Sequence, residues 1–123
     1  MSNIYRGRTA SGESNQTLLQ IAQALPRLRQ EVEHAKKNRA GSMDAIKGVI
    51  LTLLAFLEAM IATLNNNPAA NAVKIKRLQT EQARLLNEYL RIANAEEEGE
   101  LEASDHQISL VEKIMAFVYH EVR

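Results

Sequence analysis

The segment GVILTLLAFLEAMIATL, residues 48–64, carries a single charge, that of Glu58. An amphipathic surface helix keeps its apolar residues on one stripe, whereas this segment is apolar almost all round. It has to be covered by the rest of the chain, by other copies, by a partner protein or by a membrane. A bilayer span needs about 20 predominantly apolar residues, so a membrane helix is not expected. The segment predicts the most deeply covered helix of an all-α protein.

The composition excludes several classes of function. The chain has 123 residues, with 15 Lys and Arg against 15 Asp and Glu. This length predicts one domain, and a net charge near zero gives no general attraction to nucleic acid or to an anionic membrane. The absence of cysteine excludes disulfides, cysteine nucleophiles and cysteine-based zinc sites.

The N-terminal residues, MSNIYRGRTASGESNQ, are small and polar. They lack the apolar core of a signal peptide, so we expect a protein that is cytoplasmic, or secreted without a cleaved signal peptide. Residues 1–14 are expected to form a flexible polar tail. Residues 15–123 are then a single helical domain.

A first helix is expected over residues 17–39, because its apolar residues recur at steps of three and four. This spacing is typical of a coiled-coil seam. Pro26 lies inside the pattern, so either the helix bends there or a short helix ends and another begins at Pro26. Gly41 suits a helix C-terminus, and Ser42 suits the N-cap of the next helix.

Three further helices complete the pattern. The apolar segment predicts a helix over residues 43–64, which the turn Asn65-Asn66-Asn67-Pro68 closes. A helix over residues 69–97 follows as its antiparallel neighbour, and Leu86 and Leu90 widen its apolar stripe. Ser104 and Asp105 are N-cap candidates for a last helix that ends near residue 121. We therefore expect four helices, arranged either as a bundle or as an elongated helical hairpin with extra arms.

The seams of these helices are the expected interfaces, either with a partner protein or between copies in a homo-oligomer. The seam residues are Leu18, Ile21, Leu25, Leu28, Val32, Leu78, Leu85, Tyr89, Val111, Met115 and Val118. Such seams favour contact between helices. More broad apolar faces exist than one small four-helix core readily hides, so we expect association beyond a monomer.

The sequence has an acidic connection over residues 94–105, NAEEEGELEASD. Aligned with the twelve-residue calcium loop of an EF-hand, it places Gly99 at the position of the turn glycine. The candidate ligands are Asn94, Glu96, Glu98, Glu100 and Asp105. The inner glutamates are longer than the usual ligands, Asp105 replaces the usual bidentate glutamate, and no second loop is present. A solvated linker is the expected state, and a small calcium- or metal-responsive helical regulator is the alternative function.

No pattern of catalytic residues is present. Glu31 and His34 have the spacing of a di-iron bundle motif, but the motif occurs once and in a charged stretch. Glu58 is expected either to be the single solvent-facing position of its helix or to pair with a basic residue of the first or third helix. We expect no catalytic site, no metal site and no cofactor, and hence a protein that is not an enzyme.

Residues 57–123 carry features of a known family: Leu64 before the turn at residues 65–68, the run from Leu78 to Leu90, and the end FVYHEVR. In layout they resemble the needle and inner-rod subunits of type III secretion systems, and a helical chaperone of such a system would fit the length equally well. The chain is longer than those subunits, and the acidic connection interrupts the C-terminal helix. The resemblance implies a component or chaperone of a bacterial secretion or surface assembly, without catalytic residues.

Overall fold

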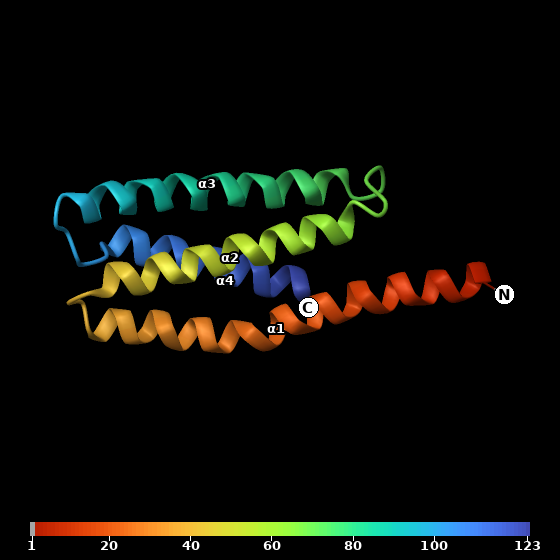
Figure 1. Ribbon diagram of the computed structural model, residues 1–123, viewed down its shortest axis with the longest axis horizontal. Helices are drawn as coiled ribbons and strands as arrows, with labels where there is room; N and C mark the ends of the chain where they lie inside the picture. Colours follow the sequence, from red (N-terminus) through yellow and green to blue (C-terminus); the bar gives the residue numbers. More distant parts are fainter. Residues whose placement is uncertain (1) are drawn as a thin grey trace.

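The protein forms a bundle of four helices, as the sequence predicts. The computed structural model describes residues 2–123, and it describes side chains from Gln16 onward. The helices are α1 (Ser2–Lys37), α2 (Ser42–Leu64), α3 (Ala72–Glu97) and α4 (Asp105–Val122). Consecutive helices are antiparallel neighbours in space (Figure 1). The described residues contain no strand, so the fold class is all-α.

The apolar helix α2 lies at the centre of the arrangement. It contacts each of the other three helices, while α1 and α3 lie on its two sides and share no contact within the described residues. α4 packs against α1 and α2 and more lightly against α3. The helices α1, α2 and α3 thus form a row, and α4 covers one side of that row (Figure 1).

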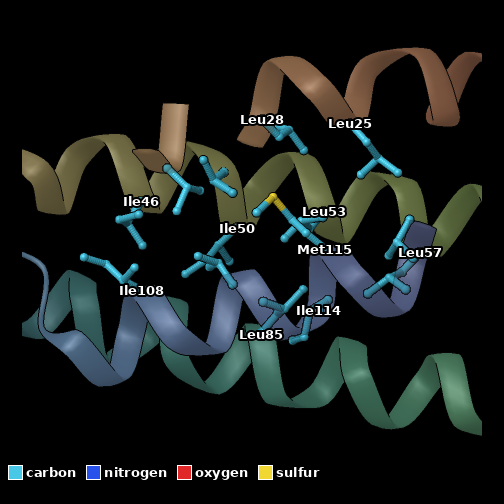
Figure 2. Packing of buried hydrophobic residues seen from close by; sticks show 14 of the residues in the cluster. Leu25, Leu28, Ile46, Ile50, Leu53, Leu57, Leu85, Ile108, Ile114 and Met115 are labelled. Carbon is cyan, nitrogen blue, oxygen red and sulfur yellow. The ribbon is translucent and has the colours of Figure 1, made fainter. Parts of the chain in front are cut away.

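The core is formed by the seams that the sequence predicts. Ile50, Leu53 and Leu57 of α2 are completely buried, and they point toward α4 and α3 (Figure 2). Leu25 and Leu28 of α1 close the core from the opposite side. Complete burial of a large aliphatic side chain stabilises a fold by about 1.5–3 kcal/mol relative to exposure, so α2 is the main contributor to stability.

α1 is longer than the sequence predicts. It begins at Ser2 rather than near Thr17, and it continues through Pro26 as one helix. A bend separates its packed part from its N-terminal part (Figure 1), as the lost backbone hydrogen bond of a proline predicts. The N-terminal part projects beyond the other helices (Figure 1). The backbone of residues 2–14 is therefore helical, where the sequence predicts a flexible tail.

Deleting residues 1–14 should leave the bundle intact. Residues 2–14 lie in the part of α1 that projects away from the bundle (Figure 1), and Leu18 is the first described side chain of α1 that packs against the core. We expect the midpoint of thermal unfolding to change by less than about 2 °C, measured by circular dichroism. A drop of more than about 5 °C would show that the N-terminal part of α1 packs on the bundle.

Candidate interaction site

The two connections at one end of the bundle are joined by hydrogen bonds. The backbone N–H of Met43 donates to the carbonyl of Leu101 at 2.9 Å, and the N–H of Ala103 donates to the Ser42 hydroxyl at 2.8 Å. Arg39 donates to the Ala103 carbonyl at 2.9 Å and pairs with Asp105. The prediction that Ser42 caps α2 is wrong: the N-cap is Gly41, with a left-handed φ of 75°. The Ser42 hydroxyl instead accepts a hydrogen bond from the connection between α3 and α4 and holds that connection against the start of α2.

The acidic connection does not form a calcium loop. Asn94 and Glu96 lie on the last turns of α3, and Gly99, with a φ of 89°, forms a left-handed turn after that helix. The N–H of Glu100 donates to the Ala95 carbonyl at 3.0 Å, which closes the helix end. No group of three or more His, Asp or Glu residues is close enough to hold a metal ion in the part of the chain that is described.

Two of the acidic residues are paired with cations from other parts of the chain: Lys47 lies on α2, and Arg39 lies in the connection between α1 and α2. Glu96 accepts a hydrogen bond from Lys47 at 2.8 Å, and both side chains are largely covered. Asp105 pairs with Arg39 at the opposite end of the connection. Because Glu96 pairs with α2 and Asp105 pairs with the connection between α1 and α2, the candidate ligands do not converge on one point.

The Lys47–Glu96 pair predicts a dependence of stability on alkaline pH. Its hydrogen bond raises the pKa of Lys47 above the ordinary 10.5, and burial acts in the opposite direction. A raised folded-state pKa contributes stability below the unfolded-state pKa, and this contribution disappears as the pH rises through the folded-state value. The thermal midpoint of the natural protein should therefore exceed that of Lys47→Gln at about pH 9, and the difference should shrink above pH 10.5. Lys113→Gln, at an exposed position of α4, is the control, and an equal pH effect in this variant would contradict the assignment.

The histidines and Glu31 lie on the surface. His34 is exposed and contacts Asn38 of the next turn, while Glu31 is also exposed. His120 lies beside the ring of Tyr119. His106 approaches Glu88 at 3.7 Å. The residues at the spacing of a di-iron motif thus lie on the exposed side of α1.

The expected interface residues lie inside the single chain. All of them are buried except Leu18 and Tyr89, which are partly buried against the core. The helical seams therefore meet one another within one bundle, which leaves them covered. An interface has to use the side chains that the bundle leaves on its surface.

A different apolar surface remains open on α2 and α3. Gly48, Leu51, Ala55, Glu58 and Ala62 face solvent on the side of α2 opposite its buried residues. Glu58 is thus solvent-facing, as the sequence predicts. Leu51 is 48% exposed, although it belongs to the most apolar helix of the chain. By length and composition α2 could also cross a membrane.

The neighbouring helix α3 also has exposed leucines. Leu86 and Leu90 are 50% and 55% exposed. They stand two residues before and after Glu88, which points toward α4, so they lie on the side of α3 away from α4. These two leucines widen the apolar stripe of α3 in the sequence, but the fold does not bury them within the chain. We call Gly48, Leu51, Ala55, Glu58, Ala62, Leu86 and Leu90 the outer face.

Glu88 is a buried charged residue that is not among the site residues predicted from the sequence. Glu88 is 4% exposed and accepts a hydrogen bond from Gln107 Nε2 at 3.3 Å. Gln107 also completes the capping box of α4, because its Oε1 accepts from the Ser104 N–H and its own N–H donates to the Ser104 hydroxyl. This confirms Ser104 as the N-cap. The burial of Glu88 could have been predicted from its spacing, because it lies three residues after Leu85 and four before Ile92, in the buried stripe of α3.

These observations define the class of protein as an all-α four-helix bundle with an open apolar face on its central helix. No model of a known protein family, no curated protein and no solved structure matches the chain.

Proposed function

We propose that the protein is a non-enzymatic helical interaction protein that binds a helix of a partner protein on its outer face. The observation that carries this proposal is the exposure of Leu51 on α2 and of Leu86 and Leu90 on α3, two helices that pack against each other. Contiguous exposed apolar surface is typical of protein interaction sites. The buried polar side chains of the described part, Ser42, Glu88 and Gln107, all hold helices together.

The shape of the outer face favours a helix as the bound element. Gly48, Ala55 and Ala62 are small and lie along one line of α2, so a second helix can approach closely there. Leu86 and Leu90 stand one turn apart on α3 at one edge of this line. An amphipathic helix commonly docks its apolar residues on an exposed apolar surface of a helical protein. One concrete form of this proposal is a component or chaperone of a bacterial secretion or surface assembly, which rests on the similarity in layout described above.

Site-specific crosslinking tests the proposal. A photoreactive amino acid is placed at Leu86 on the outer face, or at Ser109 on the exposed side of α4 as the matched control. In cells that produce the protein naturally, Leu86 should give one crosslinked species of defined mass, and Ser109 should not. The additional substitution Leu51→Glu should remove the crosslink without lowering the thermal midpoint by more than about 2 °C. Equal crosslinking from both positions, or persistence of the species in Leu51→Glu, would overturn the proposal.

A further inference from the structure

Unpaired charges of opposite sign gather at the two ends of the bundle. The end that holds the α3–α4 connection carries the exposed carboxylates of Glu97, Glu98, Glu100 and Glu102. The opposite end carries Lys74, Lys76 and Arg77 on the first turns of α3, all exposed (Figure 1). None of the ion pairs between described side chains involves these seven residues. The end with the α3–α4 connection also carries the exposed Lys37 of α1, so it is acidic in balance, and the first turns of α3 are basic, although the net charge of the chain is near zero.

The acidic end presents one apolar side chain on a fixed backbone. Leu101 lies between Glu100 and Glu102 and is 63% exposed. Its carbonyl accepts the hydrogen bond from Met43, and two residues later Ala103 is bonded to Ser42. A leucine held in this way loses little conformational freedom when it is bound.

The basic end contains a small cavity. α4 ends at Val122 before the bundle does (Figure 1), and the space beyond it is bounded by Leu18, Met60, Leu64 and Leu78. Thr63, Lys74 and Glu121 complete its lining, and the volume is about 100 Å³. A cavity of about 150 Å³ in a protein core holds a benzene molecule, so this one has the scale of a single aliphatic side chain.

We propose that copies of this chain associate end to end, with Leu101 of one copy inserted into the cavity at the basic end of the next. Glu100 and Glu102 flank the inserted leucine, and the cavity that receives it is lined by one cation, Lys74, and one carboxylate, Glu121. The exposed Lys76 and Arg77 on the same turns of α3 make the receiving end positive in balance, so the two surfaces are complementary in charge. The occupant of the cavity is thus the acidic connection of a second copy. This contact goes beyond the proposed function and does not involve the outer face.

The geometry of this contact predicts an open row of copies. Each copy offers a different surface at each end, and a head-to-tail contact of this kind extends unless its rotation closes a ring. The N-terminal part of α1 projects past the basic end (Figure 1), so the incoming copy lies beside it. Because the flanking charges remain near solvent, salt should weaken the association.

Two variants, each with one end disabled, test the proposal. Leu101→Ser removes the inserted side chain, and Lys74→Glu combined with Arg77→Glu reverses the charge around the cavity. All three positions are exposed, so both variants should keep the natural thermal midpoint. Sedimentation velocity over about a hundredfold range of protein concentration, at low and at high salt, measures the assembly of each variant and of an equimolar mixture.

The natural chain should grow in mass with concentration at low salt, and each variant alone should associate at least about tenfold more weakly. The mixture should form a dimer and stop there, because each partner retains the end that the other has lost. The outer-face variant Leu51→Glu with Leu86→Glu should assemble like the natural chain, which separates this contact from the proposed function. A natural chain that stays monomeric throughout, a Leu101→Ser variant that assembles normally, or a mixture that does not pair would each overturn the proposal.

Discussion

Replacing Leu53 by aspartate should unfold the protein. Leu53 is completely buried in the centre of α2 and lies close to Met115 of α4 (Figure 2). No cation among the described side chains lies in this part of the core. Burying a carboxylate without a partner costs several kcal/mol, and the whole stability of a domain of this size is about 5–15 kcal/mol. Circular dichroism at 25 °C should show loss of helix, or a thermal midpoint lower by tens of degrees.

Leu51→Asp is the matched control for this substitution. It makes the same chemical change two residues earlier in the same helix, at a position that is 48% exposed. Helix propensity changes equally in both variants, so the difference between them reports burial alone. We expect Leu51→Asp to fold with a nearly natural midpoint. If both variants unfold, the outer face is covered by something in the folded state, and if neither does, Leu53 is not in the core.

The second large effect is expected for Gln107→Ala. Its amide links the capping box of α4 to the buried carboxylate of Glu88. The substitution removes the acceptor for the Ser104 N–H and the one hydrogen bond that Glu88 receives from a buried side chain. Hydrogen bonds to charged groups contribute about 1.5–3 kcal/mol and a helix cap about 1 kcal/mol. We expect a loss of about 2–4 kcal/mol in the free energy of unfolding, measured by urea denaturation.

Gln79→Ala provides the control for this loss. Gln79 is exposed on α3, and the same change there should alter the free energy of unfolding by less than about 0.5 kcal/mol. A double variant, Gln107→Leu with Glu88→Leu, should recover part of the loss, because removing both polar partners leaves no unsatisfied carboxylate. Equal effects of Gln107→Ala and Gln79→Ala would show that Glu88 does not depend on Gln107.

The helices are well predicted from the sequence because their stripes of apolar residues are long. The steps of three and four residues in α1 and the continuous apolar run of α2 leave no other regular structure that could bury them. Ser104 is also predictable, since a serine three residues before a glutamine is the pattern of a capping box. The backbone of residues 2–14 is not predictable in this way, because a polar segment has no apolar period to show its conformation.

The candidate site is much less visible in the sequence. Periodicity shows that Leu86 and Leu90 are apolar, but it does not show whether a fourth helix covers them. That depends on α4 packing on the other side of the row of helices, which is a property of the whole arrangement. The attachment of the α3–α4 connection to Ser42 and Arg39 is likewise a contact between distant residues. Local spacing carries no signal for such contacts, and it therefore assigned Ser42 to the wrong role.

We infer that the helical seams are covered within one chain, so that any association uses only the remaining surface. The most direct test is the thermal midpoint of a variant with Leu51→Glu, Leu86→Glu and Leu101→Ser, measured over about a hundredfold range of protein concentration. The substitutions remove two of the three exposed leucines of the outer face and the leucine of the end-to-end contact, and they leave the seams unchanged. We predict a cooperative transition with a midpoint that does not depend on concentration. A midpoint that rises with concentration, or a variant that fails to fold, would show that the seams are shared between chains.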